Sequence, residues 1–106
     1  MSAPNAGAKL ISKVYIDFSG ASLGATGYTQ IIASLPQNTK SIYVENTSGV
    51  PVSIGMGAAS SEQEIDVTPI NSSVSKLLLL NKGMRLAVKS LSGTISTGKM
   101  LICLYA

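Results

Sequence analysis

The chain contains no histidine and no tryptophan, and its only cysteine is Cys103. Histidine is the commonest general base and the commonest ligand of transition metals, so its absence removes the usual basis for catalysis and metal binding. A single cysteine cannot form a disulfide framework or a cysteine-based zinc site. Because Cys103 lies in the apolar run MLICLY, we expect it to pack as a small core hydrophobe and not to react.

Charged residues are also scarce, at 12% of the 106 residues, which is about half the share in a typical soluble domain. Two explanations stay open: neighbouring subunits cover part of the surface, or uncharged Ser and Thr form it. The net charge is +3, but the basic residues form no run, and this gives little support for nucleic-acid binding. The few aromatic residues do not alternate with Lys or Arg as a stacking platform requires. We therefore expect no nucleic-acid partner.

The N-terminal residues MSAPNAGAK lack the charged and apolar regions of a secretory signal. Apolar runs such as Leu77–Leu80 are far too short to span a bilayer. We therefore expect no membrane partner and a protein that is made and kept in soluble form. The chain has room for one domain. Residues 1–10, mostly small and polar, predict an extended N-terminal arm, and residues 11–106 predict the folded domain.

Alternating apolar residues and intervening turn signals predict eight short β-strands. The last of them, Lys99–Tyr105, is apolar on both faces and is therefore expected in the middle of a sheet. The sixth, Val74–Leu80, is expected to be buried on both sides at Leu77–Leu80. The remaining predicted strands are Ile11–Phe18, Tyr28–Ala33, Ser41–Glu45, Pro51–Gly57, Glu62–Val67 and Met84–Leu91.

The third and fourth strands are separated by Asn-Thr-Ser-Gly, a turn signal that predicts a β-hairpin over Ser41–Gly57. In the second arm of this hairpin, Gly55 and Gly57 leave one face bare, which predicts a bulge or a close approach of other atoms to the backbone. Eight strands at a spacing of about ten residues, with no helical window, predict an all-β fold. We expect a single antiparallel eight-stranded β-sandwich of the jelly-roll type.

The strongest cluster of reactive side chains is Glu62, Glu64 and Asp66, which strand alternation places on one face. Calcium prefers oxygen ligands from a curved loop, so a calcium site here would need further ligands from Asp17, Glu45 or a carbonyl group. An acidic strip that faces solvent or a neighbouring subunit is the alternative that we favour. A glycosidase needs two carboxylates across a cleft, and a catalytic serine needs a base. Neither pattern is found, so we expect no enzyme, no cofactor and no metal.

Basic side chains are expected on the outward-facing side of the last strands, at Arg85, Lys89 and Lys76. Opposite the acidic strip of a neighbouring copy they would form complementary patches, which set the register of an interface more than its affinity. Ordinary solubility charge is the alternative. The candidate subunit-interface residues are Pro4, Lys9, Leu10, Glu62, Glu64, Asp66, Arg85 and Lys89.

Two stretches carry a recurrent pattern of strands and turns: SIYVENTSGVPVSIGMGAASSE and LLLLNKGMRLAVKSLSGTISTGKMLICLY. In the first, a strand of the type I-x-V-x-N passes through a Ser/Gly turn into an alternating strand that ends in Gly-Ala-Ala. In the second, a Lys-Gly pair leads into a strand, a Gly/Ser/Thr loop and a terminal apolar strand. This pattern resembles small β-rich virion proteins of tailed bacteriophages, over Tyr28 to Tyr105.

The resemblance implies a structural role without catalytic residues, as a capsid cement or decoration protein or as a small head or tail component. It implies binding to the major capsid protein or other virion proteins, often as a trimer, and a location in the virion after assembly in the host cytoplasm. One alternative is a receptor- or carbohydrate-binding module of a tail or fibre. A carbohydrate-binding sandwich would normally display exposed Trp or Tyr side chains, and the sequence does not reveal such a platform.

Overall fold

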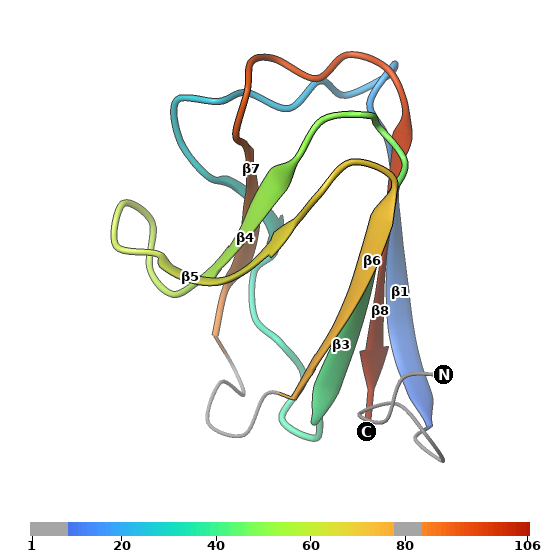
Figure 1. Ribbon diagram of the computed structural model, residues 1–106. Helices are drawn as coiled ribbons and strands as arrows, with labels where there is room; N and C mark the ends of the chain where they lie inside the picture. Colours follow the sequence, from blue (N-terminus) through green and yellow to red (C-terminus); the bar gives the residue numbers. More distant parts are fainter. Residues whose placement is uncertain (1–8, 78–83) are drawn as a thin grey trace.

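The computed structural model describes residues 9–77 and 84–106, and the regular elements in these ranges are all β-strands (Figure 1). Their bounds are close to the predicted ones. They are β1 (Leu10–Asp17), β2 (Thr29–Ile32), β3 (Ser41–Asn46), β4 (Val52–Met56), β5 (Gln63–Thr68), β6 (Ser72–Leu77), β7 (Leu86–Ser90) and β8 (Lys99–Tyr105).

The strands form two four-stranded antiparallel sheets that pack face to face (Figure 1). The first sheet has the order β1-β8-β3-β6, and the second sheet has the order β2-β7-β4-β5. Both sheets thus pair strands that are far apart in the chain, which is the arrangement of a jelly roll built from two Greek keys. The predicted eight-stranded sandwich is confirmed. So is the central position of the last strand, because β8 pairs with β1 on one side and β3 on the other.

The predicted hairpin over Ser41–Gly57 is wrong, because β3 and β4 belong to different sheets. The connection between them crosses from the first sheet to the second and is shaped by Asn46, which is fully buried. The Asn46 side chain donates to the Val50 carbonyl at 2.7 Å and accepts from the Ser48 N–H at 3.0 Å. Such a turn reverses the chain locally but does not determine which strand pairs with the next one.

The core lies between the sheets and is formed by alternate residues of the strands together with Phe18, Leu23, Leu35 and Ile95 from the loops. It consists of Phe18, Leu23, Leu35, Ile42, Val44, Val52, Ile54, Met56, Leu86, Val88, Ile95, Met100, Ile102 and Leu104. Alternation supplies Ile42 and Val44 from β3, Val52, Ile54 and Met56 from β4, and Leu86 and Val88 from β7. The sixth strand differs from its prediction. Leu77, the last residue of β6, is 52% exposed, so the predicted burial of this strand on both sides is wrong at Leu77. Residues 78–80, the rest of the stretch expected to be buried, lie outside the described residues.

Gly98, in the loop before β8, meets the crossover between β3 and β4 at close range. A Cβ at this position would lie 2.3 Å from Cα of Ser48, and the φ angle of Gly98 is +91°. Both the space and the backbone conformation therefore require glycine. Phe18 N–H donates to the Gly98 carbonyl at 2.9 Å, so this contact also connects the end of β1 to the two loops.

We predict that Gly98→Ala destabilises the fold by at least about 2 kcal/mol, because it combines a left-handed backbone with overpacking. Gly27→Ala is the matched control, since a Cβ there meets no atom within 4 Å. Urea denaturation followed by circular dichroism measures the difference. Equal midpoints for the two variants would contradict the close approach at Ser48.

Candidate functional site

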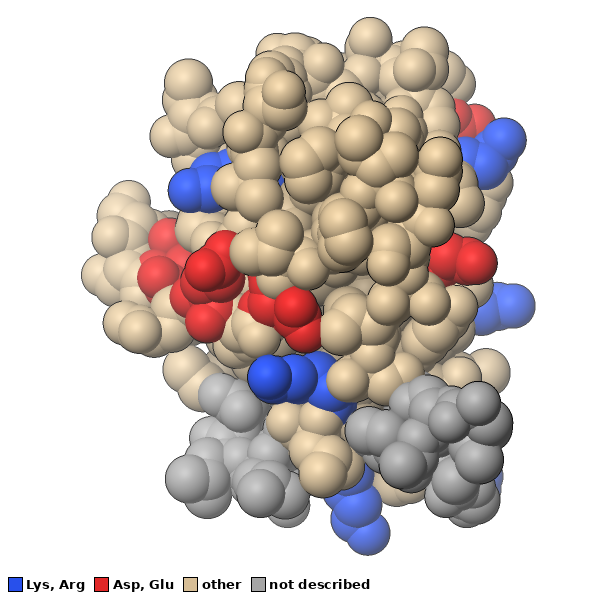
Figure 2. All heavy atoms as spheres, viewed as in Figure 1, with Lys and Arg blue, Asp and Glu red and all other residues tan. Residues whose placement is uncertain are grey.

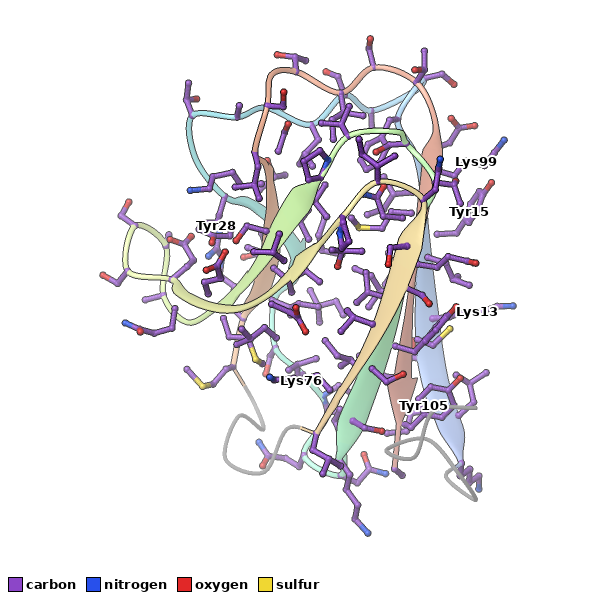
Figure 3. The ribbon with its side chains drawn as sticks, in the orientation of Figure 1. Lys13, Tyr15, Tyr28, Lys76, Lys99 and Tyr105 are labelled. Carbon is purple, nitrogen blue, oxygen red and sulfur yellow. The ribbon has the colours of Figure 1, made fainter. Side chains whose placement is uncertain are left out.

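The outer face of the second sheet carries a polar network around Tyr28, which precedes β2 (Figure 3). The Tyr28 hydroxyl lies 2.6 Å from Oγ of Ser53, and this Oγ donates to Oε2 of Glu64 at 2.9 Å. Because the serine has one hydroxyl hydrogen and gives it to the carboxylate, the tyrosine hydroxyl donates to the serine. The Lys89 ammonium lies 4.8 Å from the centre of the tyrosine ring, within the range of a cation–π interaction.

The Tyr28 ring can lie flat on this sheet because the strands beneath it carry small side chains. A Cβ at Gly55 would lie 2.8 Å from Cε1 of Tyr28, and Ala87 and Ser53 beside it are buried. The ladder also shifts register between Ile54 and Gly55. The close approach predicted at this strand is therefore confirmed at Gly55, whereas the extra residue of the bulge, Ile65, lies on the neighbouring strand β5.

Arg85, just before β7, binds three other segments of the chain. Its Nη1 lies 2.6 Å from Oε2 of Glu62 and 3.3 Å from the Gly57 carbonyl, and its Nε donates to Oε1 of Gln30 at 3.1 Å. The side chains of Arg85 and Glu62 are 15% and 7% exposed. The hydrogen bond from Arg85 lowers the pKa of Glu62 below its ordinary value of 4.5. This ion pair therefore connects β7, β4 and β2 to the segment that enters β5.

The prediction of three carboxylates on one face of β5 is wrong. Glu64 lies opposite Gly55, but after the bulge Asp66 lies opposite Ile54, which belongs to the core. Residues opposite each other in an antiparallel pair project to the same side of the sheet, so Asp66 is turned away from the outer face. Its Oδ1 accepts from the next backbone N–H at 2.8 Å. Figure 2 shows acidic side chains gathered over the β5 edge of the sandwich.

The basic residues divide in a similar way. Lys89 lies opposite Ser53 on the outer face, as predicted. Lys76 lies opposite Ile42, which is a core residue, and it points to the side of β6 that faces the second sheet (Figure 3). The predicted face of Lys76 is therefore wrong, although its side chain is exposed.

The remaining predicted interface residues lie at the start of β1. Lys9 exchanges two backbone hydrogen bonds with Ala106, at 2.8 and 3.4 Å, and Leu10 is 47% exposed. Pro4 lies outside the described residues. The structure thus separates the candidate interface residues into a group at the β1 edge of the first sheet and a group on the second sheet. Their role in a subunit interface stays a prediction.

The outer face of the first sheet was not predicted as a surface, although it brings together side chains from three strands. Tyr15 on β1, Tyr43 on β3 and Tyr105 on β8 surround Cys103. Cys103 is buried as predicted, at 7% exposure, but it lies opposite Lys13 and Tyr43 and so belongs to the outer side. Burial raises the pKa of Tyr105, and the neighbouring Cys103 adds to this shift. The alternation of residues 101, 103 and 105 is the sequence signal for this face.

Near the Lys99 end of this face lies a shallow depression of about 180 Å³. Its lining residues are Tyr15, Glu45, Thr47, Lys99, Met100 and Leu101. Within residues 9–77 and 84–106, no three Asp, Glu or Cys side chains gather in a way that could hold a metal ion. The described part of the chain also contains no helix long and apolar enough to cross a membrane.

A comparison with protein-family profiles finds no match, and a comparison with curated proteins finds no relative in sequence. Solved structures with the same fold are found. The PRD1 vertex protein P5 is 11% identical, with a TM-score of 0.57 over 92% of this chain and 95% of its own. A subunit of Bacillus endospore appendages, a family of disulfide-linked pili, is 17% identical, with a TM-score of 0.57 over 99% and 94%.

An enzyme also shares the sandwich. FeII HppE in complex with its substrate is 8% identical, with a TM-score of 0.51, and the match covers 92% of this chain but 52% of that protein. The chain therefore corresponds to about half of HppE and to nearly all of the vertex protein and the pilus subunit. At these identities the likeness shows the fold alone.

We predict that Tyr28 and Gly55 are energetically coupled. Gly55→Ala should destabilise the fold by about 1–3 kcal/mol through overpacking, and it should cost less in the Tyr28→Ala background, where the ring no longer meets the new methyl group. A double-mutant cycle by urea denaturation measures this coupling. Additive effects would show that the ring does not rest on Gly55.

We predict that the Glu62–Arg85 pair contributes to the acid sensitivity of the fold. Because the pKa of Glu62 is lowered on folding, its stabilisation is complete above the ordinary pKa and is lost as the pH falls through the lowered pKa. Glu62→Gln should therefore reduce the loss of stability that accompanies acidification below the ordinary pKa of a glutamate. Unfolding free energies at several pH values measure this, and an unchanged pH profile would exclude the pair as a contributor.

Proposed function

We propose that the chain is a non-enzymatic structural protein of a phage particle, which binds the capsid surface as a cement or decoration protein and stabilises contacts between capsomers. The observation that carries this proposal is the extent of the match to the PRD1 vertex protein P5, which covers 92% of this chain and 95% of that one. The sandwich thus corresponds to nearly the full length of the solved chain of that virion protein. The sequence resemblance to phage virion proteins supports the same role.

The use of the polar side chains also supports a structural role. Glu62, Glu64 and Asp66 all accept hydrogen bonds from within the chain, and Asp17 accepts from the N–H and hydroxyl groups of Ser19. These carboxylates therefore hold strands and turns in place. The chain also has no histidine that could activate a nucleophile.

We place the proposed contact with the capsid or with a neighbouring copy at the β1 edge of the first sheet. β1 is eight residues long and lies at the end of its sheet, so one side of its backbone is available for pairing with an added strand. Lys9 and Leu10 lie at its start, and residues 1–8 of the proposed arm, with Pro4, lie outside the described residues. A contact through Arg85 and Glu62 would first have to break their ion pair, so we favour the β1 edge.

The partner that this proposal names is the major capsid protein or another virion protein. We propose a homo-oligomer, with a trimer favoured by the resemblance to phage virion proteins, located in the virion and assembled in the host cytoplasm. The charged groups on the second sheet, Glu64, Asp66 and Lys89, are a second proposed contact.

We predict that the purified chain binds capsid shells assembled without it, saturates at a fixed ratio and raises their dissociation temperature. Leu10→Ala should weaken this binding by about tenfold if Leu10 is a buried anchor of the contact. Leu91→Ala is the matched control, because Leu10 and Leu91 are 47% and 45% exposed and Leu91 follows β7 in the second sheet. Deletion of residues 2–8, which retains Lys9 and its two hydrogen bonds with Ala106, should reduce binding further without changing the melting temperature of the free protein.

Co-sedimentation and calorimetry of the shells measure these effects. A chain that stays a monomer, does not bind shells and leaves their dissociation temperature unchanged would contradict the proposed function. Equal losses for Leu10→Ala and Leu91→Ala would contradict the placement of the contact at β1.

A further inference from the structure

Glu45 differs from the other four acidic side chains, which all accept hydrogen bonds within the chain. In the ranges 9–77 and 84–106, no hydrogen bond or ion pair engages the Glu45 carboxylate, which lies near the end of β3. It is exposed on the outer face of the first sheet. An acceptor with unused lone pairs at a fixed position is available to an external donor.

The register places this carboxylate and an exposed aromatic ring on either side of one residue of β8. Tyr15 and Glu45 lie on opposite sides of Leu101, because Leu101 pairs with both. The Tyr15 side chain is 57% exposed. The three residues line the depression of about 180 Å³, with Thr47 and Lys99 at its end. Tyr15 and Lys99 lie near one another and point away from the second sheet (Figure 3).

The depression is small and open, and this limits what it can bind. Pockets for drug-sized ligands begin at about 300 Å³, so a volume of about 180 Å³ admits a single ring or a single side chain. Its floor is apolar, formed by the Leu101 side chain and the Tyr15 ring, and its polar groups stand at the edges. Such a site favours a ligand with one apolar face and a polar rim.

The charges favour a neutral ligand. Glu45 and Lys99 carry opposite charges, and Asp17 lies opposite Lys99 in the ladder. Lys99 contributes to the lowered pKa of Asp17, after the hydrogen bonds from Ser19. A phosphate or carboxylate would face Glu45 and Asp17, and a guanidinium group would face Lys99.

We propose that this depression binds the ring of a neutral sugar. The C–H face of a pyranose packs on Tyr15 and Leu101, while ring hydroxyls donate to the Glu45 carboxylate and accept from the Lys99 ammonium and the Thr47 hydroxyl. In this arrangement the acceptor Glu45 receives hydrogen bonds from the sugar, the donors Lys99 and Thr47 give hydrogen bonds to it, and the sugar ring covers the apolar surface of Tyr15 and Leu101. The site goes beyond the capsid role and does not depend on it, because the sugar would contact side chains on the outer face of the sheet, whereas the proposed capsid contact uses the backbone edge of β1.

Titration of the ¹⁵N-labelled full chain by NMR tests the site. The probes are the methyl glycosides of glucose, galactose, mannose and N-acetylglucosamine, with inorganic phosphate and N-acetylarginine amide as the charged competitors. We expect one or more of the glycosides to shift the backbone signals of Tyr15, Glu45 and Leu101 in a saturable way, with a Kd of about millimolar for a single ring.

Tyr15→Ala and Glu45→Ala should each weaken the sugar by about tenfold or more, as expected for an anchor of a small site. Tyr15→Phe keeps the ring and should retain binding within about twofold, because its hydroxyl is not required. Leu91→Ala, outside the depression, should bind like the unchanged protein. Melting temperatures confirm that the variants are folded, and Glu45→Ala preserves the test if Tyr15→Ala does not fold.

Three outcomes would overturn the proposal. One is the absence of saturable shifts with all four glycosides. Another is sugar binding that Tyr15→Ala leaves unchanged in a folded protein. The last is binding of N-acetylarginine amide or phosphate in preference to every glycoside, which would assign the depression to a charged partner group. None of these results bears on binding to capsid shells, which is measured separately.

Discussion

The structure depends on the pairing of two C-terminal strands in the interior of the two sheets. β8 lies between β1 and β3, and β7 lies between β2 and β4. Each sheet is therefore completed only when the last quarter of the chain inserts between strands that come much earlier. These pairings are long-range and antiparallel, so the loops that connect the sheets must pass one another closely. The contact between Gly98 and Ser48 is one such crossing.

The outer faces of the two sheets differ in how far their polar side chains are hydrogen-bonded within the chain. On the second sheet, the Tyr28 ring lies on Gly55, and its hydroxyl, Ser53 and Glu64 form a continuous chain of hydrogen bonds. This face satisfies its own polar groups. On the first sheet, Tyr15 is 57% exposed, and Glu45 beside it has no partner in the part of the chain that the structure describes. We therefore place the proposed interactions with other molecules on the first sheet, at its β1 edge and in its depression.

Strands and core could be predicted from the sequence, because both depend on the local alternation of apolar and polar residues. The pairing of strands could not, since the Asn46 turn has the same sequence signal whether the chain returns to its own sheet or crosses to the other. A single bulge in β5 moved Asp66 off the face of Glu64, and alternation alone cannot detect it. The outer face of the first sheet, with Tyr15 and Glu45, combines side chains from β1, β3 and β8. Only the topology brings these strands together.

A cryo-EM reconstruction of the virion that carries this protein tests the central claim most directly. The account predicts one jelly-roll domain per binding position on the capsid surface, with the β1 edge of the first sheet against a capsomer or a neighbouring copy. The Tyr15 and Glu45 side of the sheet should then face solvent. The account would be contradicted if the purified virion did not contain this protein. It would also be contradicted if the β1 edge of the bound protein faced solvent and touched no neighbour.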